Sequence, residues 1–339
     1  MPHTAEPRSY AVRAAAAAIG LTTALSLAAC GGGAPSSERA PASPKPSATA
    51  SSTPVPHSVV TLSEANKILD NYQAVNNRAN ATRDAKLLAT VEAGQLYARS
   101  KAEFEQFETL SKKDQKDYSS PFTFTDRTFY LPASGDWFAA QATTTGKNHT
   151  LLVFEKSPAT GNAWKKVVSL FPAKALPSVD TIGGVAQTAA ASGTAGKLAP
   201  DGVTAAVEDL FTTGGAKQGA AFTRTSDNVK SILKTYKERG EDLGPHAKVS
   251  FFPSTPLHDT VYALGTHDGV LAIAPLAHHE ESLVLQPGLQ INPGKVGSVY
   301  DKSPRPVMVD SFQGEALVLL PDKGQPDILD YRYAQTGSR

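Results

Sequence analysis

The sequence predicts an α+β protein in which helices pack on a curved antiparallel sheet, with two such domains in tandem. In residues 59–110 and again in 201–240, apolar side chains recur every three or four positions, the spacing of one helix face. After each segment the period falls to two and short polar turns separate the apolar runs, as in an antiparallel meander. Residues 59–339 are numerous enough for one large or two ordinary domains.

Residues 1–29 have the composition of a secretory signal peptide. Arg8 and Arg13 lie in a charged start, residues 14–27 carry no charge, and two alanines follow. The uncharged run is shorter than the roughly 20 residues that cross a bilayer. A cleaved signal is therefore favoured over a transmembrane helix.

The motif Leu27-Ala28-Ala29-Cys30 resembles the lipobox of bacterial lipoproteins. The resemblance implies cleavage between Ala29 and Cys30 and a diacylglyceryl group on the Cys30 thiol, which would anchor the exported chain at the outer face of the cytoplasmic membrane. The alternative is that Cys30 is an ordinary small residue in a signal cleaved elsewhere. Cys30 is the only cysteine in the sequence, so the predicted domains contain no disulfide and depend on their cores.

Residues 30–58 follow the anchor as a tether rich in proline, serine and alanine, a composition typical of disorder. At about 3.1 Å per residue in a polyproline-like conformation, this tether would span roughly 80 Å. Removing residues 1–29 takes two arginines and one glutamate from the 33 basic and 32 acidic residues, so the mature chain is neutral, with 31 of each. This balance argues against a nucleic-acid partner, and beyond the anchor it indicates no attraction to acidic lipid.

The first predicted domain covers residues 59–173. Thr61 and Glu64 form a capping-box pattern at the start of a helix of about five turns. Two further helices are expected in residues 84–93 and 99–110. Four strands joined by short turns follow, in residues 122–131, 137–145, 151–155 and 164–171.

The order of elements in this domain, helices first and a meander afterwards, resembles NTF2-like and cystatin-like folds. In such folds a cavity at one end of the sheet often holds a small molecule. The resemblance makes four aromatic residues candidates for the cavity lining, while core packing is the alternative for each. They are Tyr130, Trp137, Phe138 and Trp164. Asp126 and Asp136 are candidate pocket carboxylates or, alternatively, ordinary turn residues.

Residues 174–200 are rich in alanine, glycine, serine and threonine and are predicted to be a linker. The second domain, residues 201–339, repeats the plan of the first. Helices are expected from Asp201 to Thr213 and from an N-cap at Ser226 to Gly240. Seven strands are expected after them, in residues 248–252, 260–266, 270–275, 282–285, 306–312, 315–320 and 328–334, with turns at 267–269, 313–314 and 322–324.

Ser226-Asp227-Asn228 and Ser231-Ile232-Leu233-Lys234 imitate two motifs of the penicillin-binding proteins. In that family the Ser-x-x-Lys motif comes first and the second motif lies on another element across the cleft. Here the order is reversed, both motifs lie on one predicted helix, and Lys-Thr-Gly is absent. An N-cap role for Ser226 explains the first motif, so no acyl-enzyme is expected.

The densest group of ionisable residues is His278-His279-Glu280-Glu281. Imidazole and carboxylate groups suit zinc, but none of these residues has the i, i+4 spacing of a helical metal motif. Neighbours on a strand point to opposite faces, so the sequence favours a polar loop or sheet edge here and no metal site.

In layout and in its high alanine and proline content, the whole chain is similar to the secreted lipoproteins of Streptomyces and other actinobacteria. That resemblance implies no particular activity. No catalytic residue and no cofactor is expected, and the favoured function is a non-catalytic binding module for a small ligand or an envelope component. A structural or protein-interaction lipoprotein and an envelope hydrolase remain as alternatives.

Overall fold

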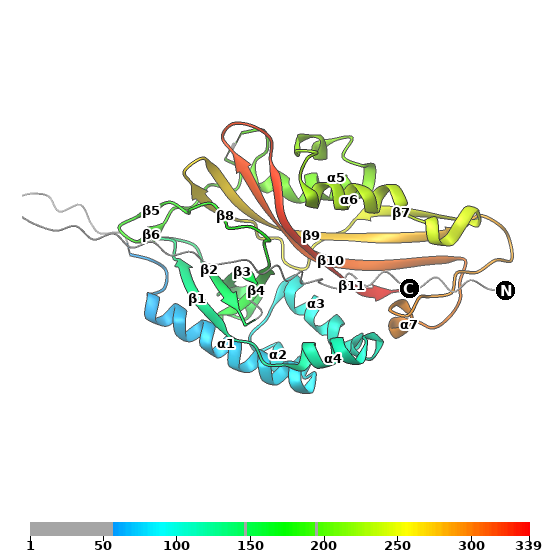
Figure 1. Ribbon diagram of the computed structural model, residues 1–339, viewed down its shortest axis with the longest axis horizontal. Coiled ribbons are helices and arrows are strands. Elements are labelled where there is room, and N and C mark those ends of the chain that lie inside the picture. Colours follow the sequence, from blue (N-terminus) through cyan, green and yellow to red (C-terminus); the bar gives the residue numbers. More distant parts are fainter. Residues whose placement is uncertain (1–56, 146–147, 194–195) are drawn as a thin grey trace, which may run out of the picture. The chain divides into compact units, whose positions relative to one another are not determined.

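The computed structural model describes residues 57–145, 148–193 and 196–339. The signal peptide, Ala29, Cys30 and all but the last two residues of the predicted tether lie outside the described residues, as do Gly146 and Lys147 of one predicted turn. The α+β class is confirmed, because helices pack on antiparallel sheets in both halves of the described chain (Figure 1).

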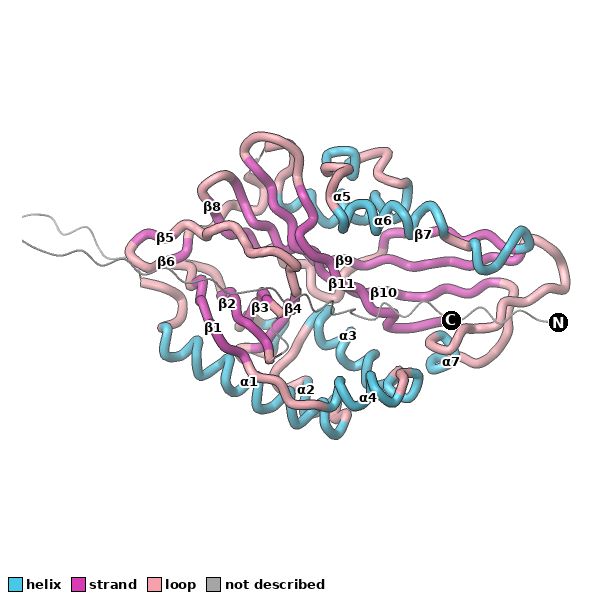
Figure 2. The backbone as a smooth tube through the Cα atoms, in the orientation of Figure 1, coloured by secondary structure: helices cyan, strands magenta, loops and turns pink. Residues whose placement is uncertain are grey.

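Four layers make up the body, in the order helices, sheet, sheet, helices (Figure 2). One apolar core lies between the first helices and the first sheet, and another lies between the second sheet and its helices. A third core joins the two sheets face to face and takes residues from both, including Leu151, Val153, Leu264 and Ile273. Each sheet is therefore covered on both faces over the length where the two sheets overlap.

The first half begins with the predicted capping box. The Thr61 hydroxyl accepts a hydrogen bond from the backbone N–H of Glu64, whose carboxylate accepts one from the backbone N–H of Thr61. The helices are α1 (Leu62–Thr82), α2 (Ala85–Leu88), α3 (Gly94–Glu105) and α4 (Lys112–Ser119), with a short 3-10 helix η1 (Phe107–Thr109). The sequence did not predict α4, which buries no side chain and so has no apolar stripe.

The predicted four-stranded meander is confirmed. Its strands pair in the order β1-β2-β3-β4, with antiparallel neighbours throughout. They are β1 (Phe124–Tyr130), β2 (Trp137–Thr144), β3 (His149–Glu155) and β4 (Lys165–Leu170), with a 3-10 turn η2 (Pro158–Thr160) between the last two.

The segment predicted as a linker runs along both sheets. It forms the short hairpin β5 (Thr181–Ile182) and β6 (Val185–Ala186). The backbone N–H of Ala186 donates to the carbonyl of Leu131 beside β1, and the N–H of Gly265 in β8 donates to the carbonyl of Gln187. Because unpaired sheet edges attract other chains, these contacts protect one edge of each sheet.

The second half has two main helices followed by strands. The helical elements are η3 (Pro200–Gly202), α5 (Val203–Thr213), η4 (Gln218–Ala221), α6 (Asp227–Glu238), η5 (Glu241–His246) and α7 (Gly297–Tyr300). The strands are β7 (Ala247–Pro253), β8 (Tyr262–Thr266), β9 (Gly269–Val284), β10 (Val307–Pro321) and β11 (Asp327–Ser338). The sheet order is β11-β10-β9-β7, and β8 pairs with the other end of β9.

Two predicted strand breaks in this half are wrong. Residues 270–275 and 282–285 belong, but for Leu285, to the single strand β9, and residues 306–312 and 315–320 belong, but for Pro306, to the single strand β10. The predicted turn at Gln313-Gly314 is therefore the middle of a central strand, paired with Leu276 and Ala277. A glycine was interpreted as a turn signal, but here it makes room for the neighbouring strand.

Gly314→Ala is expected to destabilise the protein by about 1–3 kcal/mol, the usual cost of forcing atoms into a packed site. A Cβ at residue 314 would lie 2.1 Å from the carbonyl oxygen of Arg332 and 2.7 Å from the Tyr333 ring. Gly337→Ala on the same strand pair is the matched control, since its nearest neighbour would be 3.9 Å away. Urea unfolding of both variants measures the difference, and equal stabilities would contradict the steric explanation.

Candidate functional site

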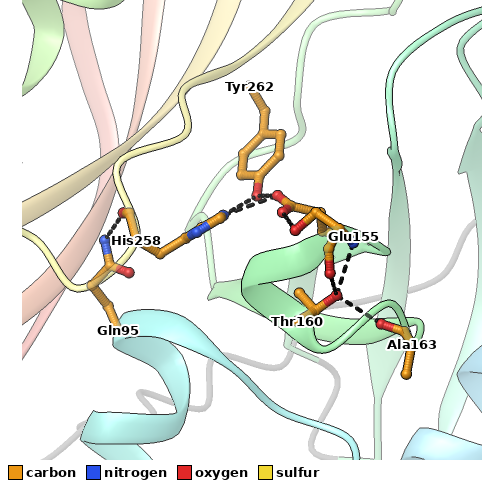
Figure 3. A network of polar contacts seen from close by, with 7 residues as sticks. Gln95, Glu155, Thr160, Ala163, His258 and Tyr262 are labelled. Atoms are coloured by element: carbon orange, nitrogen blue, oxygen red, sulfur yellow. Dashed lines mark hydrogen bonds and ion pairs between the residues drawn. The ribbon is translucent and has the colours of Figure 1, made fainter.

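A polar cluster lies in the layer between the two sheets, where β3 and β8 approach one another. The Nε2 atom of His258 lies 2.9 Å from a carboxylate oxygen of Glu155 and 3.0 Å from the hydroxyl of Tyr262 (Figure 3). The Tyr262 hydroxyl donates to that same carboxylate, and the Ser157 hydroxyl donates to its other oxygen. A histidine, a carboxylate and two hydroxyls thus converge from segments about 100 residues apart.

Local packing fixes His258 in this position. It lies in the loop between β7 and β8, and the Gln95 side-chain amide at the start of α3 donates to its carbonyl oxygen. Gly94 has a positive φ of 62°, and a Cβ there would lie 2.8 Å from the Cβ of His258. Only a residue without a side chain lets the two segments approach so closely. The loop is therefore held against α3 through both backbone and side chain.

Hydrogen bonding sets the charges in this cluster. Burial raises the pKa of Glu155, but the hydrogen bonds from His258, Ser157 and Tyr262 outweigh it and hold the pKa below its ordinary value. Burial, followed by the charge of Glu155, raises the pKa of Tyr262 well above its ordinary value. Glu155 is consequently an ionised acceptor surrounded by donors. The Ser157 hydroxyl bonds to Glu155 and not to His258, so the serine-to-histidine hydrogen bond of a nucleophilic hydrolase is not formed.

A second buried cluster lies beside the first. Arg99 of α3 forms an ion pair with Glu315 of β10, and both side chains are almost fully buried. Tyr72 of α1 donates a 2.8 Å hydrogen bond to Glu92, whose carboxylate lies 3.7 Å from the Lys166 ammonium. That ammonium also lies 4.0 Å from the centre of the Tyr72 ring. The pair of Arg99 with Glu315 connects α3 to the second sheet, and the contacts of Tyr72, Glu92 and Lys166 join α1 to β4 within the first half.

Burial strongly shifts the pKa values of three groups in the second cluster, and it raises that of Tyr72 well above its ordinary value. Burial lowers the pKa of Lys166 to about 8, although the charge of Glu92 opposes the change. Burial raises the pKa of Glu315 to about 7 despite the Arg99 guanidinium beside it. Such shifts are common in active sites and also in structural ion-pair networks, so access to solvent decides between them.

The space at the junction of the two clusters is small. A cavity of about 10 Å³ is lined by groups that include Gln95, His258, Thr260, Tyr262 and Glu315. That volume accommodates about one water molecule. The Oε1 atom of Glu315 is buried and has no hydrogen-bond partner among the described residues, so a single water is the ligand that this cavity fits. A substrate does not fit.

The four aromatic residues proposed to line a cavity do not share one. Phe138 is fully buried, stacks on Phe154 and contacts Trp164, all on the helix-covered face of the first sheet. Tyr130 and Trp137 lie on its other face, in the core between the sheets, where Trp137 packs against Tyr262. The two predicted carboxylates are exposed, Asp126 at a bulge in β1 and Asp136 in the turn before β2.

The interpretation of His278-His279-Glu280-Glu281 as a polar loop or sheet edge is wrong, because all four residues lie inside the central strand β9. His278 is buried, and its Nδ1 lies 3.2 Å from the carboxylate of Glu208 in α5. Tyr333 of β11 donates a 2.7 Å hydrogen bond to the other oxygen of Glu208. The hydrogen-bonding partner of His278, the Glu208 carboxylate, comes from a distant segment of the chain. No group of three or more metal-binding side chains occurs within residues 57–145, 148–193 and 196–339.

The serines of the penicillin-binding-protein-like motifs are both on or beside α6. Ser226 occupies the N-cap position as predicted, but its hydroxyl makes no capping hydrogen bond with the helix. The Ser231 hydroxyl accepts a 3.1 Å hydrogen bond from the Tyr331 hydroxyl. The Lys234 ammonium lies 3.8 Å from a carboxylate oxygen of Glu238. The Ser226 hydroxyl donates to the carbonyl of Ile328 and the Ser231 hydroxyl bonds to Tyr331, so neither of these contacts is with a histidine or lysine that could activate the serine.

A surface groove of about 480 Å³ lies between η5 and β7, and we call it the η5 groove. It combines apolar side chains with charged ones, a mixture found in ligand sites. Its lining residues are Arg239, Gly240, Glu241, Gly244, Ala247, Lys248, Val249 and Leu285. No sequence pattern indicated this groove, because Leu285 comes to lie beside residues 239–249 only in the folded chain.

Comparisons with known proteins agree with the layout of the sequence. A family model described as "Domain of unknown function (DUF8094)" matches residues 56–339. An uncharacterized lipoprotein of Streptomyces coelicolor is 30% identical over 327 residues, which span 93% of this chain and 90% of the relative. No solved structure matches. The predicted similarity to Streptomyces lipoproteins is confirmed, and the likeness to NTF2-like and cystatin-like folds stays a prediction.

The similarity to a lipoprotein supports membrane anchoring of this chain. Within the described residues, none of the helices combines the length and apolar character that crossing a bilayer requires.

The free energy of unfolding of the wild type is expected to fall between about pH 4.5 and pH 7. The substitution Glu315→Gln is expected to remove this fall. Because the pKa of Glu315 is raised to about 7, the folded protein keeps a proton that the unfolded chain has lost. The stabilisation of the fold by this retained proton is complete below pH 4.5 and is lost as the pH rises through 7. It amounts to at most roughly 3 kcal/mol. Urea unfolding across this range compares wild type and variant, with the exposed Glu108→Gln as control. Parallel curves for wild type and Glu315→Gln would contradict the assignment.

Proposed function

The chain belongs to the DUF8094 family, and on that premise we propose that it is an exported lipoprotein, anchored by lipid at Cys30, that binds an envelope component through its surface and performs no catalysis. The anchor would hold the folded body at the outer face of the cytoplasmic membrane. Its partners in this proposal are the membrane, through the acylated cysteine, and a protein or other component of the envelope.

The anchor is supported by the N-terminal sequence and by the relative. Leu27-Ala28-Ala29-Cys30 follows an uncharged run and precedes a segment without packing residues. The relative that carries the name lipoprotein is similar over nearly the whole chain. Two acyl chains on one cysteine give stable attachment, where a single chain would give only marginal binding.

One observation carries the non-catalytic part of the proposal: the cavity that His258 lines, beside its contact with the Glu155 carboxylate, has a volume of only about 10 Å³. A hydrolase needs such groups at the wall of a cleft that admits substrate. Glu155 and His258 instead use their hydrogen-bonding atoms on one another and on neighbouring hydroxyls. Their arrangement supports a structural role between the sheets.

A second candidate function is a binding module for a small ligand, supported by the η5 groove. Its volume of about 480 Å³ lies within the usual range for ligand sites, and Arg239, Glu241 and Lys248 place charges of both signs on its wall. A fragment screen by crystal soaking tests this candidate, and fragments that bind elsewhere but never in the groove would remove it.

Cys30→Ala is expected to abolish incorporation of an alkyne-tagged fatty acid and to move the protein from the detergent phase to the aqueous phase on detergent partition. The reason is that Cys30 is the only thiol available for acylation. Ser36→Ala, in the same N-terminal region, is the matched control and should keep the label. A signal peptide left uncleaved by the substitution would be visible as a larger chain. Undiminished labelling of Cys30→Ala would exclude the proposed anchor.

Ser231 is expected to remain unlabelled by a fluorescent penicillin, because its hydroxyl, on an exposed helix, is hydrogen-bonded to Tyr331 and not to a base. The assay uses the purified mature chain, with a penicillin-binding protein as a positive control and Ser231→Ala as the reference for background. Covalent labelling that disappears in Ser231→Ala would overturn the non-catalytic proposal.

A further inference from the structure

Exposed apolar side chains gather in the connection between β9 and β10 and in the strand ends that flank it, residues 283–307, which we call the β9–β10 tip. Among the described residues, nine large apolar side chains are exposed, and five of them lie in this tip: Leu283, Leu285, Leu289, Val299 and Val307. Contiguous exposed apolar residues mark contact sites in soluble domains, whereas scattered ones are ordinary.

The tip has a defined structure. Leu283 and Val307 are directly opposite on β9 and β10, so their side chains share one face of the sheet. Ile291 and Arg305 exchange backbone hydrogen bonds of 2.8 and 3.2 Å across the connection. Within it, the Tyr300 hydroxyl at the end of α7 donates to the carbonyl of Gln335 in β11. The exposure of these apolar side chains is therefore built into the fold.

The connection is also unusually long. Twenty-two residues separate the end of β9 at Val284 from the start of β10 at Val307, and α7 is the only helix among them. Antiparallel neighbours can be joined by two residues, and loops longer than about 15 residues are mostly functional. A segment of this length is not needed to reverse the chain.

The tip carries a positive charge although the mature chain is neutral. It contains Lys295, Lys302 and Arg305 against the single acid Asp301, a net charge of +2. Arg305 pairs with Asp301 at 2.6 Å, which leaves the two lysines as the uncompensated charges. Lys248 lies directly across from Leu283 on β7 and adds a third lysine beside the apolar residues. Exposed apolar side chains in a segment with a net positive charge match a bilayer surface that contains anionic lipid.

We propose that the β9–β10 tip rests on the anionic lipid surface to which the chain is anchored, a proposal that rests on the lipid anchor proposed for Cys30. The 27 residues from Cys30 to His57 can reach roughly 90 Å at full extension. The 16-residue strand β9 is only about 50 Å long, so the anchor does not prevent this contact. The tip gives the tethered body a second, weak attachment that fixes which side faces the envelope.

The test uses the mature chain with Cys30→Ala, so that no acyl chain contributes to binding. Co-sedimentation with vesicles of phosphatidylglycerol and phosphatidylcholine should show binding that is lost in pure phosphatidylcholine and falls with salt. Leu285→Ser with Leu289→Ser should weaken binding to the anionic vesicles about tenfold, and Lys302→Glu should weaken it and reduce its dependence on salt. Circular dichroism verifies that each variant is folded.

The matched control is Leu62→Ser with Ile182→Ser, two apolar residues that are 57% and 61% exposed but lie outside the tip. This variant should bind as the parent does. Equal binding by the tip variants and the control, or no binding to anionic vesicles, would overturn the proposal. Concentration-dependent dimers that the tip variants abolish would also overturn it, by assigning the tip to a second copy of the chain. None of these outcomes bears on acylation of Cys30, which fatty-acid labelling tests separately.

Discussion

Face-to-face packing of the two sheets is the contact on which the rest of the structure depends. The core between them takes apolar residues from β2, β3 and β4 on one side and from β8, β9 and β10 on the other. Sheets packed this way leave about 10 Å between their backbones, which side chains fill. A polar group in that layer must find its partner there or in a trapped water, because bulk water does not reach it. The ion pair of Arg99 with Glu315 and the group of Glu155, His258 and Tyr262 meet this requirement, and both connect the two halves of the chain.

Local signals predicted the parts of the fold that depend on neighbours in sequence. Thr61 and Glu64 predicted the start of α1, and the alternation after residue 121 predicted the four-stranded meander. The continuity of β9 and β10 was missed for a physical reason. Histidines, glutamates and a Gln-Gly pair are typical of loops, but in a central strand their partners come from other segments, as Glu208 does for His278. Glycine at 314 is explained by a neighbouring strand and not by a turn.

The residues of the candidate site likewise differ in whether local sequence signals could predict them. Cys30 stays a prediction, and it rests on a short contiguous motif that can be recognised without the fold. Trp137 and Phe138 are adjacent on β2 and so point to opposite faces, a consequence of strand geometry that already argues against one pocket lined by both. The approach of His258 to Glu155 could not be predicted, because 103 residues separate them and only the packing of the two sheets brings them together. Sequence patterns report burial and turns well, and they report long-range polar contacts poorly.

Differences in strand length explain why exposed apolar residues gather at one end of the second sheet. Strands β9 and β10 have 16 and 15 residues, whereas the strands of the first sheet have six to eight. At about 3.3 Å per residue, the longer strands extend roughly 25 Å farther than the sheet that covers them. Beyond that overlap, one sheet face has no opposing sheet, and Phe252, Leu283 and Val307 are exposed on it. The overlapping part is closed by its own packing, so the part that extends past it is where this fold can meet a partner.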